Sequence, residues 1–100
     1  MLYIGFTDVE QTKLTGDYGV DILAYKDGYT YAIQCKRRAS NVGNKAIQEV
    51  FTGKAHYNCD KAIVMTNSTF TKNAIELAKD TEVELFDRSY LQSILSKSSI

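Results

Sequence analysis

The sequence predicts an α/β protein in which a mixed β-sheet is flanked by helices, and two observations support this class. An Asp27-Gly28 pair separates two runs rich in β-branched and aromatic residues, at positions 20–25 and 29–36. Asp-Gly between such runs is a strong signal for an antiparallel hairpin with a two-residue turn. Toward the C-terminus, short apolar runs alternate with helical stripes, which is typical of βα units in a sheet with parallel strands.

The first half of the chain reads as strands followed by a helix. Residues 1–14 have a loose alternation that predicts an extended segment, and residues 16–19 predict a turn before the hairpin. A helix is expected from position 44 to about 57, with Asn41 or Asn44 as its N-cap. Its apolar stripe consists of Ile47, Val50, Phe51 and Ala55.

The second half alternates between the two kinds of element. Residues 62–66 form a continuous apolar run that suits a strand covered on both faces. A second helix follows, with its apolar stripe at Phe70, Ala74, Leu77 and Ala78. A short strand at 83–86 and a last helix after Asp87 complete the order β-β-β-α-β-α-β-α.

Composition indicates an ordinary globular domain. The chain has 100 residues, of which 44% are hydrophobic and 24% charged, so we expect one domain over residues 1–100 with a sufficient core. Two cysteines and one histidine are too few for a structural zinc site, and free thiols are the expectation. We find no membrane-spanning run and no leader pattern, and therefore expect a cytoplasmic protein.

The charge is balanced in total but uneven along the chain. The formal net charge is zero, yet residues 36–61 carry six basic and two acidic side chains, while residues 76–87 carry five acidic and one basic. Such a distribution leaves room for a basic face that binds nucleic acid.

The hairpin turn fixes which residues oppose each other across the two strands. With Asp27-Gly28 as the loop, Asp21 lies opposite Gln34, and Lys36 is the diagonal neighbour of Asp21 on the same face. A carboxylate, an amide and an ammonium group then converge on one patch, where the two oxygen donors suit a hard divalent cation. The same pattern is also typical of a plain cross-strand ion pair, and a one-residue bulge would turn Asp21 to the other face.

Five blocks of the sequence resemble one known family when they are taken in order. They are "GDYGVDI", "IQCKR", "IQEVFTGKAHY", "AIVMTNSTFTKNAIELA" and "VELFD". Together they resemble the Mrr-type branch of the restriction endonuclease-like nucleases, the PD-(D/E)XK superfamily. The resemblance covers nearly the whole chain, and we find no counterpart of the helix that usually precedes the first strand, so a core without that helix is expected.

The resemblance implies a metal-dependent nuclease site. It assigns Asp21, Gln34 and the backbone carbonyl of Cys35 to Mg²⁺, with Mn²⁺ as a substitute, and it assigns Lys36 to the attacking water. Hydrolysis would leave a 5′-phosphate and a 3′-hydroxyl. Gln34 stands where the superfamily more often has Glu, which removes one negative charge and implies weaker metal binding.

Further residues are candidates beside this set. Asp17 is a possible additional carboxylate, although it also suits a turn, and of the neighbouring Gln48 and Glu49 we favour Gln48. Basic residues that could contact DNA phosphates are Arg37, Arg38, Lys45 and Lys54, and for these an ordinary solvated surface is the alternative.

Three functions fit these residues. The first is a DNA endonuclease, expected to be a homodimer because cutting a duplex requires two sites, with specificity supplied by a separate subunit or domain. The second is a non-catalytic nucleic-acid-binding module that kept the fold and lost its metal. The third is a resolvase of branched DNA such as a Holliday junction.

Overall fold

The computed structural model describes residues 7–11 and 19–98, and within them the predicted order of elements is confirmed. The strands are β1 (Thr7–Gln11), β2 (Ile22–Lys26), β3 (Tyr29–Lys36), β4 (Lys61–Thr66) and β5 (Glu84–Phe86). The helices are α1 (Asn44–His56), α2 (Lys72–Thr81) and α3 (Arg88–Ser98). The predicted turn at 16–18 lies outside the described residues.

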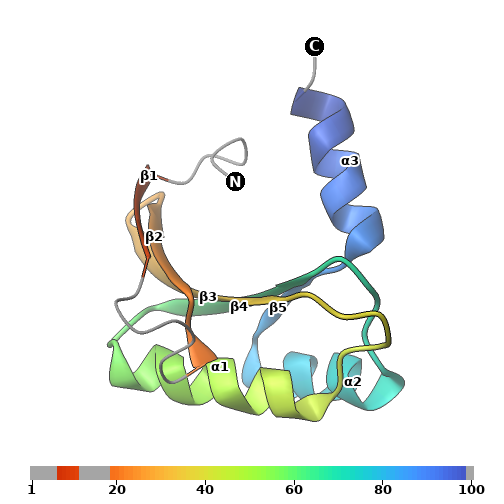
Figure 1. Ribbon diagram of the computed structural model, residues 1–100. Helices are drawn as coiled ribbons and strands as arrows, with labels where there is room; N and C mark the ends of the chain where they lie inside the picture. The colour runs from red at the N-terminus through yellow and green to blue at the C-terminus, as the bar shows by residue number, and fades with distance from the viewer. Residues whose placement is uncertain (1–6, 12–18, 99–100) are drawn as a thin grey trace.

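The strands form one mixed sheet in the order β1-β2-β3-β4-β5 (Figure 1). β1, β2 and β3 pair antiparallel, whereas β3, β4 and β5 pair parallel. Asp27 and Gly28 have φ of 52° and 85°, the two positive values that a two-residue hairpin turn requires. The predicted register is confirmed from Lys26↔Tyr29 to Leu23↔Ala32.

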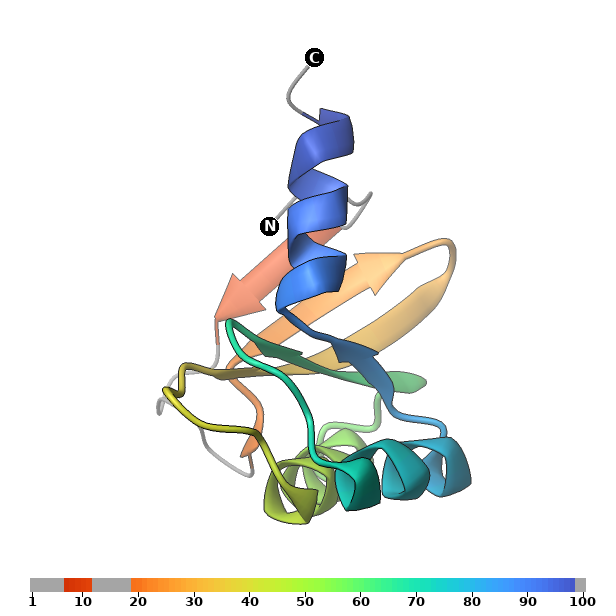
Figure 2. The same ribbon diagram turned by 90° about the vertical axis from the view of Figure 1, so that its right-hand side faces the viewer.

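The helices lie on both faces of the sheet. Figures 1 and 2 show α1 and α2 on one face and α3 rising from the other. The face under α1 and α2 holds the larger apolar cluster, which includes Val20, Ala32, Ile47, Val50, Val64 and Ala74. The opposite face holds Ala24, Tyr31, Ile33, Ile63, Met65 and Phe86, with Leu91 of α3 packed against them. As predicted, β4 is covered on both faces, since five of its six residues are buried.

The predicted start of α1 at Asn44 is confirmed, but its predicted N-cap is wrong. The N-cap is Gly43, and the side chain of Asn41 accepts a hydrogen bond from Thr69 Oγ1 at 3.2 Å. α2 begins at Lys72 and not at Phe70, since Thr71 is its N-cap and accepts from the backbone N–H of Ala74 at 3.1 Å. Such local side-chain bonds decide a helix end, and the apolar stripe does not reveal them.

The chain approaches α1 closely just before β2. Gly19 has φ of +68°, and a Cβ atom placed there would lie 2.6 Å from Cβ of Glu49 and 2.9 Å from its carbonyl carbon. Glycine is therefore required at this position for its backbone conformation and for space. This contact fixes the start of the hairpin against the middle of α1.

No helix in the described part of the chain is long and apolar enough to cross a membrane.

We predict that Gly19→Ala destabilises the fold more than Gly28→Ala does. Both glycines have positive φ, which costs a side-chain-bearing residue about 1–2 kcal/mol. A Cβ at position 28 meets nothing within 4 Å, whereas at position 19 it overlaps α1, which adds about 1–3 kcal/mol of overpacking. Urea denaturation of the two variants measures the difference, and equal losses in unfolding free energy would contradict the close contact.

Candidate active site

Gln34 and Lys36 lie at the C-terminal end of β3 and point toward α1. They are two residues apart on a strand, so their side chains share a face of the sheet. Gln34 is 3% exposed and Lys36 is half-buried. The sequence prediction that these two side chains lie together is thus confirmed by their position on one strand face.

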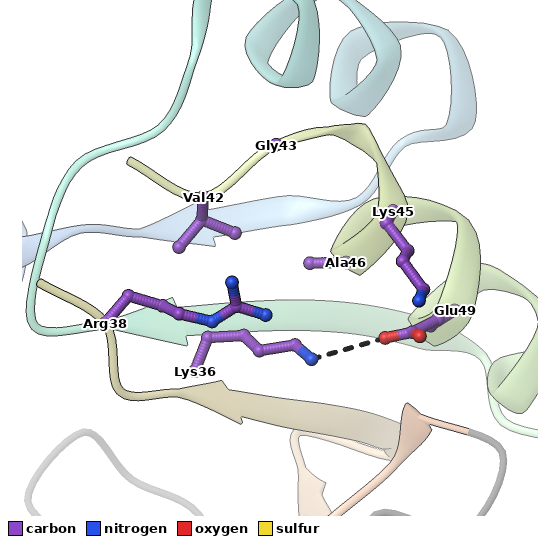
Figure 3. A pocket seen from close by; sticks show the side chains of 7 residues that line it. All are labelled: Lys36, Arg38, Val42, Gly43, Lys45, Ala46 and Glu49. Carbon is purple, nitrogen blue, oxygen red and sulfur yellow. Dashed lines mark ion pairs between the residues drawn. The ribbon is translucent and has the colours of Figure 1, made fainter. Parts of the chain in front are cut away.

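Both side chains meet the same oxygen atom of α1. Gln34 Nε2 donates a hydrogen bond to Glu49 Oε1 at 2.9 Å. Lys36 Nζ lies 3.3 Å from the same oxygen, and Figure 3 shows this ion pair. Burial alone would raise the pKa of Glu49, but the hydrogen bond from Gln34 and the positive charges of Lys36 and Lys45 outweigh it and lower the pKa. Glu49 is therefore an ionised carboxylate at neutral pH.

The other end of the Gln34 amide is buried without a hydrogen bond in the described part of the chain. This end is the side-chain carbonyl oxygen, Oε1. An ionised carboxylate accepts hydrogen bonds only, so Glu49 requires the NH₂ group and leaves the oxygen pointing elsewhere. A buried unpaired acceptor costs about 1–3 kcal/mol, so this oxygen calls for a ligand.

Asp21 departs from the predicted register. The β2–β3 ladder ends at Ile22↔Ile33, and the backbone N–H of Asp21 donates to the Ile33 carbonyl at 2.9 Å, so that Asp21 and Ile22 both oppose Ile33. This is the local geometry of a β-bulge, and it removes Asp21 from the position directly opposite Gln34.

The side chain of Asp21 nevertheless reaches the motif strand. Its Oδ2 accepts a hydrogen bond from the backbone N–H of Cys35 at 2.8 Å. The N–H and C=O of one strand residue point to the same neighbouring strand, so the Cys35 carbonyl is directed to the edge where Asp21 lies. Asp21 thus lies beside Cys35, the residue between Gln34 and Lys36.

These oxygen atoms fit a hard divalent cation. In the described ranges, no three His, Cys, Asp or Glu side chains lie close enough to hold a metal ion. A cation at this place would need amide and backbone oxygens as ligands beside a carboxylate. Asp21, the Cys35 carbonyl and Gln34 Oε1 offer such a set, and Mg²⁺ accepts these donors together with several waters. The buried unpaired oxygen of Gln34 supports this fit.

The remaining acidic and amide candidates have different outcomes. Asp17 lies outside the described residues. Gln48 is exposed, while its neighbour Glu49 is the member of the pair that contacts the motif strand. The sequence could have indicated this contact, because the helical spacing places Glu49 beside the buried stripe of Ala46, Val50 and Gly53. A role for Gln48 stays a prediction.

Two of the four basic candidates line one pocket beside Lys36. A pocket of about 150 Å³ is lined by Lys36, Arg38, Val42, Gly43, Lys45, Ala46 and Glu49 (Figure 3). The backbone N–H of Arg38 donates to Asn67 Oδ1 at 2.9 Å, which fixes the chain where it leaves β3. Arg37 is exposed, and Lys54 lies 5.7 Å from the ring centre of Phe51; neither lines this pocket.

Comparison with known proteins bears on the family and the fold of the chain. A family model described as restriction endonuclease, of the Mrr catalytic type, matches residues 1–95. No curated protein matches the chain.

Three solved structures are similar to the chain in fold. A protein of unknown function, AF1548, has a TM-score of 0.79 and 20% identity, over 94% of this chain and 58% of that one. The DNA modification-dependent restriction endonuclease AspBHI has a TM-score of 0.78 and 17% identity, over 92% and 26%. EndoMS in its apo form has a TM-score of 0.61 and 19% identity, over 83% and 37%. The chain thus spans 58% or less of the length of each.

We predict that Gln34→Met changes the unfolding free energy by less than about 1 kcal/mol. The variant loses a hydrogen bond to a charged acceptor, worth about 1.5–3 kcal/mol, but it also removes an unpaired buried carbonyl that costs about 1–3 kcal/mol. Ile33→Ala, at the neighbouring fully buried position, should cost about 2–5 kcal/mol and shows that the assay detects core loss. A loss above about 3 kcal/mol for Gln34→Met would mean that the oxygen is structurally satisfied.

Proposed function

The chain belongs to the restriction endonuclease family of the Mrr type, and we propose that it is a metal-dependent DNA endonuclease whose site is formed by Asp21, Gln34 and Lys36. The observation that carries this proposal is the buried side-chain oxygen of Gln34, which has no hydrogen-bond partner within the described ranges and lies on the strand that also carries Lys36. A structural role does not explain why a buried amide leaves its acceptor without a partner, whereas a cation ligand does.

In this proposal each residue has a distinct role. Asp21, Gln34 Oε1 and the Cys35 carbonyl hold Mg²⁺, for which Mn²⁺ substitutes. When bound, the ion polarises the scissile phosphate and lowers the pKa of a coordinated water. Lys36 is half-buried beside Glu49, and its ammonium group orients the attacking water and stabilises negative charge on the phosphoryl oxygens. The products would carry a 5′-phosphate and a 3′-hydroxyl.

The basic pocket supports a path for the DNA strand toward this site. Arg38 and Lys45 face the pocket that Lys36 also lines, so a strand whose phosphate lies at Lys36 has two further cations close by. The pocket also lies next to Gly43, the N-cap of α1, where the helix dipole places partial positive charge that favours an anion. The described first turn of α1 has no acidic side chain that would offset this charge. Contacts of Arg37 and Lys54 with DNA, and a homodimer that cuts both strands, are further parts of the proposal.

The second candidate is a DNA-binding module without catalysis, and one observation favours it. Asp21 is the one carboxylate among the proposed metal ligands, because Gln34 is neutral and Glu49 is paired with Lys36. Fewer negative ligands mean weaker cation binding. The two candidates predict opposite results with Mg²⁺ and with chelator.

We predict that the wild type nicks supercoiled plasmid with Mg²⁺ or Mn²⁺ and loses this activity in chelator, and that Lys36→Ala lowers the rate about 10²–10³-fold. That range is the usual loss when one preorganised donor to a developing negative charge is removed. Lys79→Ala, which removes an exposed lysine from α2, is the matched control and should retain the wild-type rate. Wild-type protein that binds plasmid equally with metal and with chelator, and cuts with neither, would establish the binding module instead.

We predict that Arg38→Ala and Lys45→Ala each reduce the salt dependence of DNA binding. Each contact with a phosphate contributes about 0.9 to the slope of log K against log salt for duplex DNA, so each variant should lower the slope by about that amount. The measurement is fluorescence anisotropy with a labelled duplex over a range of salt concentrations, with Lys79→Ala as the control. Unchanged slopes in both pocket variants would place the DNA elsewhere on the surface.

A further inference from the structure

Glu49 is the residue of the site that has no role in the proposed reaction. It lies on α1, across from the end of β3, and its Oε1 binds both the Gln34 amide and the Lys36 ammonium group. Its side chain is 34% exposed, so it is neither a core residue nor a fully solvated one. The contact with Gly19 holds the Glu49 backbone in place from the other side.

The Gln34 amide needs an orienting partner if it is to serve a cation. An amide has a donor end and an acceptor end of nearly the same shape, and only the oxygen binds a hard cation. Turning the group by half a rotation would present NH₂ to the ion and abolish binding. Nothing in the shape of Gln34 itself favours one orientation, so the choice must come from a neighbour.

Glu49 makes that choice through its charge. An ionised carboxylate accepts hydrogen bonds and cannot donate one, so the short bond of 2.9 Å requires the NH₂ end of Gln34 to face it. The oxygen is then left buried on the other side of the amide, with no partner among the residues that the structure describes. The same carboxylate offsets the positive charge of Lys36, which would otherwise repel a cation held next to it.

We propose that Glu49 is a positioning residue that fixes the Gln34 amide with its oxygen toward the divalent cation. The inference rests on the proposed function, because it concerns the ligand set of the same site. It explains how a neutral Gln can serve as a cation ligand at this position. Glu49 on α1 supplies the negative charge, and Gln34 on β3 supplies the oxygen that faces the cation. Residues that orient metal ligands typically contribute about 10–100-fold to metal affinity.

Mn²⁺ binding to the protein without DNA tests the proposal. Electron paramagnetic resonance of free Mn²⁺ gives the dissociation constant, and Glu49→Ala should weaken it about 10–100-fold relative to the wild type. Glu76→Ala is the matched control, since it also removes a carboxylate, here an exposed one on α2, and should bind Mn²⁺ like the wild type. Urea denaturation of each variant confirms that it is folded under the conditions of the titration.

A double variant that exchanges the side chains of positions 34 and 49 provides a second test. The double variant Gln34→Glu with Glu49→Gln exchanges donor and acceptor, which preserves the hydrogen bond and places the charge on the strand. It should bind Mn²⁺ within a few-fold of the wild type or more tightly. Wild-type affinity in Glu49→Ala, or a double variant as weak as Glu49→Ala, would overturn the positioning role.

A separate readout distinguishes this inference from the proposed function. The side-chain NH₂ signals of Gln34 in a ¹⁵N-labelled protein should be protected from solvent exchange in the wild type and lose that protection in Glu49→Ala. Absence of Mn²⁺ binding in the wild type would refute the metal-dependent nuclease, and the NH₂ signals would still decide whether Glu49 fixes the amide. NH₂ signals that are the same in both proteins would overturn the positioning role by themselves.

Discussion

The packing of α1 across the end of β3 is the constraint on which the candidate site depends. Gly19 lets the chain before β2 lie against Glu49, and Glu49 in turn binds Gln34 and Lys36 on β3. One helix position therefore joins the start of the hairpin to the end of the motif strand. The larger apolar cluster beneath the sheet, with Ile47 and Val50 of α1 fully buried, holds this helix in register with the strands.

The electrostatics of the site follow from this packing. A carboxylate on the strand would have placed a negative charge directly among the metal ligands, whereas here the strand carries a neutral amide and the helix carries the charge. The hydrogen bond from Gln34 and the positive charge of Lys36 lower the pKa of the Glu49 carboxyl group, although this group is partly buried. The arrangement leaves the buried oxygen of Gln34 without a partner in the described part of the chain, a local loss of stability that is typical of sites shaped for a ligand.

Much of this fold was predictable because its signals are local. Asp27-Gly28 fixed the hairpin and its register, and the continuous apolar run of β4 indicated a strand buried on both faces. The predicted pairing of Asp21 with Gln34 was wrong, because a bulge depends on backbone geometry that residue types do not encode. The contact of Glu49 with the motif strand follows from the helix geometry, in which a shift of one residue turns a side chain by about 100°.

Whether Asp21, Gln34 and the Cys35 carbonyl hold one divalent cation is decided by locating that ion on the protein. Mn²⁺ titrated into ¹⁵N-labelled protein broadens the amide signals nearest to the ion. We expect the signals of residues 21 and 34–36 to broaden first and saturably, and excess Mg²⁺ to restore them. Broadening that begins instead in the acidic stretch at 76–87, or that spreads evenly over the chain, would contradict this ligand set.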